Sequence, residues 1–110
     1  MILVIGFLVP RSYLGITIWP FIIIRNRYLK NDQTLIRHER IHLKQQLELL
    51  VVFFYLWYGL EYFFKRIRYK NHKNAYMNIC FEREAYAHES DTVYLKNRLP
   101  WQFIKYVTAP

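Results

Sequence analysis

Hydrophobic and polar positions divide the chain into an extended first part and a helical remainder. Residues 1–30 are rich in β-branched and aromatic side chains and are interrupted by Pro10, Gly15 and Pro20, which is typical of short strands. Because Pro20 has no N–H to donate, the strand beside it is expected at a sheet edge or a bulge. Strands followed by helices predict an α+β fold, in a single domain that covers residues 1–110.

A long helical pattern follows the strands, over residues 33–69. Asp32 and Thr34 are the candidates for its N-cap, because either side chain can accept a hydrogen bond from the first backbone amides. Gly59 interrupts the pattern, and glycine is the poorest helix former after proline. We therefore expect the helix to break sharply near Gly59.

A second helix is predicted over residues 75–89, and Asn74 is expected to cap it. The polar residues 69–74 before it indicate a turn between the two helices. The remaining segment, residues 90–110, is expected to contain a short C-terminal helix. The order of elements is thus strands, a long bent helix, a second helix and a short last one.

The first helix carries an HExxH motif, which reads His38-Glu39-Arg40-Ile41-His42. Residues four apart lie on one face of a helix, so the two imidazoles can bind one metal ion. Neutral imidazoles suit Zn²⁺, with a carboxylate as third ligand and water as fourth. Glu39 can reach that water and accept its proton, but it is not placed to bind the metal as well.

A third ligand is expected from the second helix, which carries Glu82, Glu84 and Glu89. Glu82 and Glu84 point about 200° apart on a helix, so only one of them can face the metal. Glu89 lies on the same face as Glu82, about two turns further along. The residues alone leave Glu82 and Glu84 as alternatives.

The HExxH motif and the following Glu82-Arg83-Glu84-Ala85 together resemble the gluzincin-type zinc metallopeptidases. These enzymes carry HExxH on one helix and a glutamate ligand on a later helix. Their minimal bacterial members often have E-x-E-A-D as the second motif, and this chain matches its first four positions. The resemblance implies zinc bound by His38, His42 and Glu82. It also implies that Glu39 is the general base of peptide-bond hydrolysis.

The resemblance has two further implications. The segment 15–25 would supply an edge strand that aligns a peptide substrate by strand addition. The family pattern also has an aspartate that orients a histidine ligand, where this chain has Tyr86. If Glu84 were the ligand, His88 would stand at the corresponding offset. Tyr86, His88 and Tyr94 are candidates for stabilising an oxyanion, and each also has a structural interpretation.

The spacing between the two motifs constrains the fold. A straight helix from His42 to Tyr69 would carry the chain about 40 Å away from the histidines. A return helix that ends at Glu82 would recover only about 12 Å of that distance. A bend at Gly59 allows the chain to close, so the zinc hypothesis requires a sharp break in this region.

Charge and hydropathy add candidate partners. The net charge is +8, and the run Leu49–Leu60 is apolar on every side of a helix, with cationic residues following at 65–70. Such a run is buried in a core, in contact with a second copy of the chain, or against an anionic membrane surface. A nucleic-acid partner is disfavoured because the chain has no phosphate loop and no zinc-finger spacing. The single Cys80 excludes an internal disulfide.

No apolar run approaches the 20 or so residues of a transmembrane helix, and the N-terminus lacks the features of a signal peptide. We therefore expect an intracellular protein, peripheral to a membrane if it contacts one. Two functions follow. The first is a small zinc metallopeptidase that acts on peptides or proteins. The alternative is a non-enzymatic membrane-associated or oligomeric helical protein with a structural or vestigial metal site.

Overall fold

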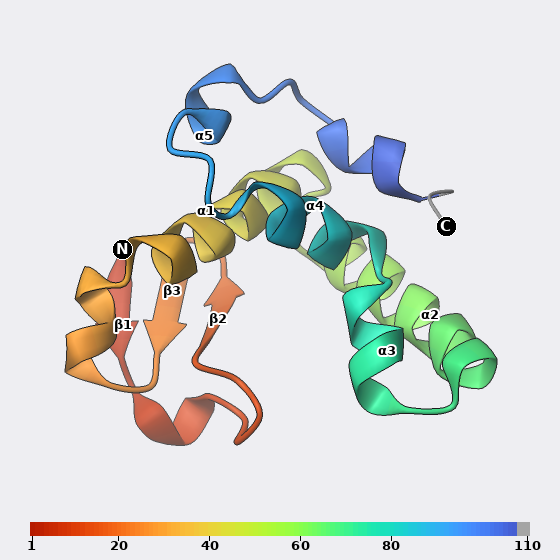
Figure 1. The fold of residues 1–110 in the computed structure, drawn as a ribbon, viewed down its shortest axis with the longest axis horizontal. Coiled ribbons are helices and arrows are strands. Elements are labelled where there is room, and N and C mark those ends of the chain that lie inside the picture. The colour runs from red at the N-terminus through yellow and green to blue at the C-terminus, as the bar shows by residue number, and fades with distance from the viewer. Residues whose placement is uncertain (108–110) are drawn as a thin grey trace.

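A computed structural model describes residues 1–107 and has three strands followed by helices (Figure 1). The strands are β1 (Ile2–Val4), β2 (Gly15–Ile18) and β3 (Phe21–Ile24). The helices are α1 (Gln33–Glu48), α2 (Val52–Tyr69), α3 (His72–Met77), α4 (Cys80–His88) and α5 (Tyr94–Asn97). Short 3-10 helices cover Gly6–Leu8, Arg27–Asn31 and Gln102–Tyr106. The predicted α+β class is confirmed; residues 108–110 of the expected C-terminal segment lie outside the described residues.

The strands form one sheet in the order β1-β3-β2. β1 runs parallel to β3, and β2 runs antiparallel to β3 with Thr17 opposite Ile22. Pro20 lies in the turn between β2 and β3, where its missing N–H interrupts no ladder. β2 is therefore an edge strand, as expected for the segment beside Pro20.

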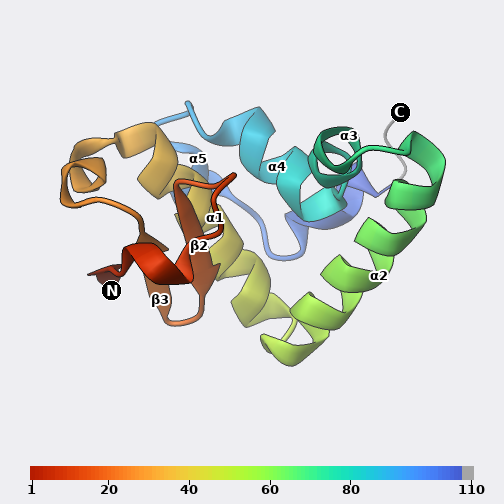
Figure 2. The ribbon, with the colours of Figure 1, turned by 90° about the horizontal axis from the view of Figure 1, so that it is seen from below.

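Helix α1 lies between the sheet and α4, and Figure 2 shows it near the centre of the molecule. Asp32 caps it by accepting a hydrogen bond from the Leu35 amide at 3.1 Å, which settles the choice between the two predicted caps. Ile36 packs in a cluster with residues of β3, whereas Ile41 packs with Ala85 of α4. Both faces of α1 are thus fixed by packing.

The long helix does break, but at Leu49–Val51 and not at Gly59 as predicted. The axes of α1 and α2 are bent by 112° there, and Leu50 and Val51 have positive φ angles of 56° and 34°. Positive φ is unfavourable for both residue types. The bend stands because it brings Leu49 and Phe54 from its two sides into one core cluster.

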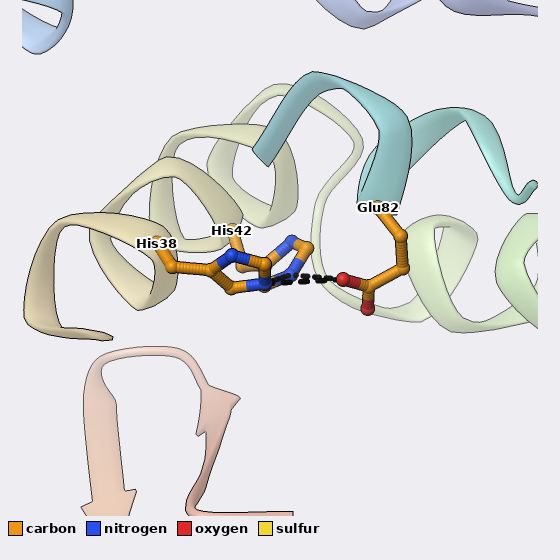
Figure 3. Close-up of side chains that lie close together, drawn as sticks. All are labelled: His38, His42 and Glu82. Atoms are coloured by element: carbon orange, nitrogen blue, oxygen red, sulfur yellow. Dashed lines mark hydrogen bonds and ion pairs between the residues drawn. The ribbon is translucent and has the colours of Figure 1, made fainter. Parts of the chain in front are cut away.

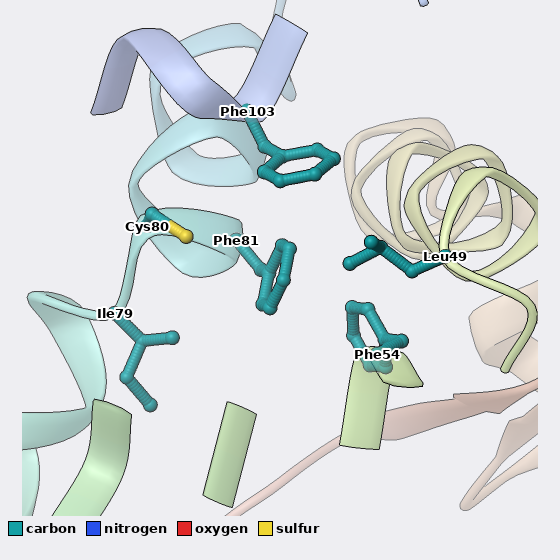
Figure 4. Packing of buried hydrophobic residues seen from close by; sticks show 6 residues of the cluster. All are labelled: Leu49, Phe54, Ile79, Cys80, Phe81 and Phe103. Carbon is teal, nitrogen blue, oxygen red and sulfur yellow. The ribbon is translucent and has the colours of Figure 1, made fainter. Parts of the chain in front are cut away.

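Phe81 of α4 lies at the centre of this cluster, and Figure 4 shows it between Phe103 on one side and Leu49 and Phe54 on the other. Its ring centroid is 4.5 Å from that of Phe54 and 4.9 Å from that of Phe103. The C-terminal segment therefore closes the core beside the bend. The gain from packing around a buried aromatic ring outweighs the helix propensity of single residues.

The predicted second helix is divided into α3 and α4 by a break at Asn78–Ile79. The side chain of Asn71, and not of the predicted Asn74, caps α3, with Oδ1 accepting from the Asn74 amide at 2.9 Å. α4 begins at Cys80, whose amide donates to Glu61 Oε2 of α2 at 2.9 Å. A carboxylate at the first turn of α4 suits the helix dipole, so α2 fixes where α4 starts.

Helix α2 leaves most of its apolar surface uncovered. Phe54 is its only fully buried residue, and the run that looked apolar on every side has one inner and one outer face. Among residues 1–107 no single helix is long and apolar enough to cross a membrane, and the one pair that reaches this length together, α1 with α2, is sharply bent.

Gly59→Ala tests the position of the break. Gly59 lies inside α2 with no atom within 4 Å of an added Cβ. Alanine should therefore stabilise the protein by about 0.5–1 kcal/mol, because it lowers the entropy of the unfolded chain without a clash. Urea unfolding monitored by circular dichroism measures this change.

Gly15→Ala is the matched control, because an added Cβ there would meet the carbonyl oxygen of Ile23 at 3.2 Å. This substitution in the paired strand should not stabilise the protein. If Gly59→Ala instead destabilises the protein, Gly59 does not lie inside a regular helix, and the break is near Gly59 as the sequence predicted.

Candidate metal centre

Three buried side chains converge between α1 and α4: His38 and His42 of the HExxH motif and Glu82 (Figure 3). Glu82 Oε1 lies 3.1 Å from Nε2 of His38 and 3.1 Å from Nε2 of His42. The two Nε2 atoms are 3.2 Å apart. Each residue is about 5% exposed, so the three atoms meet away from bulk water.

The far side of each imidazole is held by a hydrogen-bond acceptor. His38 Nδ1 lies 2.7 Å from Glu89 Oε1, and His42 Nδ1 lies 2.8 Å from Gln45 Oε1. Both partners are oxygens, so each Nδ1 donates a hydrogen and each Nε2 keeps its lone pair in the neutral ring. This is the tautomer that a metal-binding histidine needs.

The charges around the three atoms favour a cation at their centre. Burial lowers the pKa of His42, but the charge and hydrogen bond of Glu82 outweigh burial and raise that pKa to about 9. Burial raises the pKa of Glu82, yet His42 and His38 hold it well below its usual range. A proton or a metal ion can supply the positive charge that these groups favour.

The donor set fits zinc. Two imidazole nitrogens and one carboxylate oxygen are a common ligand set of catalytic zinc sites, which leave the fourth position for water. Ligand atoms at usual zinc distances around a tetrahedral ion are about 3.4 Å apart. The separations of 3.1–3.2 Å are close to this value, so the side chains need to move little to accept an ion.

The second oxygen of Glu82 is also held in place. Tyr58 of α2 donates to Glu82 Oε2 at 2.7 Å. Burial, followed by the charge of Glu82, raises the pKa of Tyr58, so this phenol stays protonated and remains a donor. A hydrogen bond to one oxygen leaves the other free to face the histidines.

Glu84 turns away from the histidines into a separate buried network. Its carboxylate accepts from Arg98 Nε and from Tyr94 OH, both at 2.5 Å, and from Gln45 Nε2 at 2.9 Å. Burial raises the pKa of Glu84, but the hydrogen bond of Arg98 outweighs burial and lowers it. Gln45 links this network to the metal centre, because its Oε1 accepts the hydrogen bond from His42 Nδ1. The structure thus places Glu82, and not the alternative Glu84, at the predicted ligand position.

Glu39 lies on the wall of a cleft of about 230 Å³ that also borders His42 and Glu82. Its Oε1 accepts from the hydroxyl of Thr17 on β2 at 2.6 Å. Its Oε2 has no hydrogen-bond partner within residues 1–107. One carboxylate oxygen is therefore fixed and the other is available to a group in the cleft.

The edge of β2 forms another wall of this cleft. The Arg25 amide donates to the Leu14 carbonyl at 2.9 Å, and antiparallel alternation then points the backbone groups of Gly15 away from β3. Further along, the Thr17 carbonyl accepts from Gln46 Nε2 at 2.8 Å and from Tyr55 OH at 2.6 Å. Side chains thus satisfy the carbonyl of Thr17, and the edge at Gly15 faces the cleft.

The aromatic candidates for an oxyanion donor lie at different distances from the site. The rings of His88 and Tyr94 stack on each other at 3.8 Å, beside the Glu84 network. The ring of Tyr86 lies 4.4 Å from the ring of His38, and its hydroxyl is 3.3 Å from that of Tyr76. Tyr76, which the sequence did not single out, borders the cleft.

Sequence reasoning missed most of the supporting residues. Glu89 accepts the hydrogen bond that orients His38, a role for which the family pattern has an aspartate at the position of Tyr86. Its position two turns after Glu82, on the same helix face, could have indicated this role. Gln45, one turn after His42, gave a similar but weaker signal. Tyr58 and Thr17 come from distant segments, and no local pattern marks them.

Comparison with family models, with curated proteins and with solved structures finds no match for this chain. A function must therefore be inferred from the geometry of the site.

Glutamine substitutions at Glu82 and Glu84 should separate their roles. Glu82→Gln removes a ligand charge and should weaken zinc binding by more than the 10–100-fold typical of an outer partner. Glu84→Gln should leave zinc affinity closer to wild type, but lower the unfolding midpoint because Arg98 loses a buried partner. Competition with a fluorescent chelator and thermal unfolding measure the two effects. Equal zinc affinities would remove Glu82 from the site.

Glu89→Ala should weaken zinc binding by about 10–100-fold, because the ring of His38 loses the acceptor that fixes its tautomer. Glu89→Gln should restore most of the affinity, since an amide oxygen can accept the same hydrogen bond. Asp91→Ala, which removes the side-chain acceptor of the exposed Val93 amide, is the control and should bind as wild type. Competition with the fluorescent chelator measures these affinities. An unchanged zinc affinity in Glu89→Ala would contradict the role of Glu89 in positioning His38.

Proposed function

We propose that this protein is a small zinc-dependent metallopeptidase. The observation that supports the proposal is the convergence of His38, His42 and Glu82 at one buried point beside a cleft. Glu39 borders the same cleft with a free carboxylate oxygen. This arrangement agrees with the resemblance of the two motifs to the gluzincin-type metallopeptidases.

Zinc held by the three ligands would act as a Lewis acid and lower the pKa of a bound water toward about 7. Glu39 is the group that accepts a proton from the attacking water and returns it to the leaving amine nitrogen. Thr17 holds the Glu39 carboxylate in one orientation through the hydrogen bond of 2.6 Å. Glu89, Gln45 and Tyr58 keep the ligands in place during turnover.

The cleft suits an extended peptide. The backbone of Gly15 offers one N–H and one C=O to a chain that lies along the edge of β2. A side chain at position 15 would approach both the Ile23 carbonyl, at 3.2 Å, and Glu39 Cγ, at 3.8 Å. Glycine therefore keeps the edge next to Glu39 open, and the substrate class that fits is a peptide or an unfolded segment of a protein.

Metal content and turnover test the proposal together. Protein purified without an affinity tag should contain close to one zinc per chain by elemental analysis, and His42→Ala should lose it. Glu39→Gln should keep the zinc, because all three ligands remain, and should lose hydrolysis by about 100-fold or more. Cleavage of a mixture of unstructured peptides, followed by mass spectrometry, measures the activity.

Arg40→Gln is a matched control within the motif, because Arg40 is exposed and points away from the ligands. It should retain both zinc and activity. Protein that binds zinc but cleaves no peptide in the mixture, with Glu39→Gln behaving identically, would favour the structural metal site of the alternative function.

A further inference from the structure

The outer face of α2 is an apolar stripe with no covering element in residues 1–107. Its members recur at spacings of three and four residues, so they lie on one side of the helix. Each is more than half exposed; the stripe consists of Phe53, Leu56, Leu60, Phe63, Phe64 and Ile67. Figure 2 shows α2 at the end of the molecule opposite the sheet, with α3 and α4 only on its inner side.

A shallow groove widens this surface beyond the helix. It has a volume of about 900 Å³ and runs from Phe53 and Leu60 of the stripe to Trp101, near the C-terminal 3-10 helix. A continuous exposed apolar surface beside polar and charged residues is a feature of interaction sites.

Exposed cationic side chains lie at the C-terminal end of the stripe. Arg66 and Arg68 precede and follow Ile67, so they project about 100° to either side of it. Both are exposed, and Lys70 and Lys73 follow in the exposed turn and α3. An apolar face with long cationic side chains on both flanks matches the boundary between acyl chains and anionic headgroups.

A second copy of this chain is a poor match for these cations, because it carries the same net charge of +8, although two helices with such spacing can pair. All eight Asp and Glu side chains already have partners. Those of the metal centre and the network below it are Glu39, Glu82, Glu84 and Glu89. Elsewhere Glu48 binds Arg98, Glu61 binds Trp57 and the Cys80 amide, and Asp32 and Asp91 accept from backbone amides. With 16 Lys and Arg side chains against these eight carboxylates, charge complementarity favours an anionic partner for the stripe over a second copy.

We propose that the apolar stripe docks α2 onto an anionic lipid surface, with the helix axis in the plane of the interface. Large apolar side chains enter the acyl region, and Arg66 and Arg68 reach the headgroups. The inner face of α2 carries Phe54 and Tyr58, which border the cleft. Docking thus holds the cleft about one helix diameter, or about 10 Å, from the lipid. The docking surface does not depend on the proposed peptidase activity.

Vesicle binding tests the docking of the full chain. The wild type should cosediment with vesicles of phosphatidylcholine and phosphatidylserine, and less with phosphatidylcholine alone. Each cation near an anionic surface contributes about fivefold in affinity, and salt screens this contribution. Binding should therefore fall at high salt without vanishing, because the apolar contacts remain.

Paired variants separate the electrostatic contribution to vesicle binding from the apolar contribution. Arg66→Glu with Arg68→Glu should weaken binding to the anionic vesicles by about 25-fold or more. Its control is Arg27→Glu with Lys30→Glu, which makes the same change in net charge at exposed positions. Both belong to the 3-10 helix Arg27–Asn31 between β3 and α1, a segment at the opposite end of the molecule from α2 (Figure 2). Phe63→Ser with Phe64→Ser should abolish binding to both vesicle types, whereas Phe7→Ser, 89% exposed outside the stripe, should have no effect.

Circular dichroism should show the same helix content in all variants, because every substituted side chain is exposed. The proposal is overturned if the wild type ignores both vesicle types, or if it sediments as a stable dimer that Phe63→Ser with Phe64→Ser dissociates. It is also overturned if the two charge-reversed pairs weaken binding equally, since attraction would then reflect only net charge. Loss of zinc or of hydrolysis in a Glu39 or His42 variant leaves the vesicle result unchanged.

Discussion

Three acceptor atoms that face one another in a buried space need a positive charge between them. The three atoms come from α1 and α4, so the packing of these two helices depends on that charge. The Nε2 atoms of His38 and His42 and Oε1 of Glu82 all lie within 3.2 Å of one another. Without a cation or a proton this arrangement would be repulsive in a region of low dielectric constant. The hydrogen bonds that His38 and His42 donate to Glu89 and Gln45, and that Tyr58 donates to Glu82, prevent the side chains from relaxing apart. In the proposed metal site the ligands are thus preorganised, so little of the free energy of binding an ion would be spent on assembling them.

A second buried network supports the first and explains why Glu84 is close to the ligands without being one. Arg98 pairs with both Glu84 and Glu48, and the side chain of Gln45 connects Glu84 to His42. An ion pair of this kind contributes little net stability, because desolvation offsets its attraction. Its geometry is demanding, however, and it fixes the rotation of α4 about its axis. That rotation decides which of two glutamates, about 200° apart, faces the histidines.

The parts of the site that follow from local geometry could be predicted from the sequence. HExxH on a helix places its histidines on one face, and helical phase lets only one of Glu82 and Glu84 face them. The choice of Glu82 came from the motif resemblance. The spacing of the two motifs required a break in the long helix, but its position could not be predicted, because helix propensity pointed to Gly59. Tertiary packing of Leu49 and Phe54 on Phe81 outweighs about 1 kcal/mol of propensity and places the bend at Leu49–Val51. Thr17 and Tyr58 were missed for a related reason: their roles exist only once distant segments meet.

The early bend also changes what the apolar run means. In the sequence alone, the run Leu49–Leu60 is apolar on all sides, which leaves burial, a second copy and lipid as alternative explanations. With α2 continuous from Val52 to Tyr69, its inner side chains close the core and the cleft, and its outer ones have nothing from residues 1–107 to cover them. The two proposals are therefore compatible, because different side chains of α2 border the proposed catalytic cleft and form the proposed lipid-docking stripe.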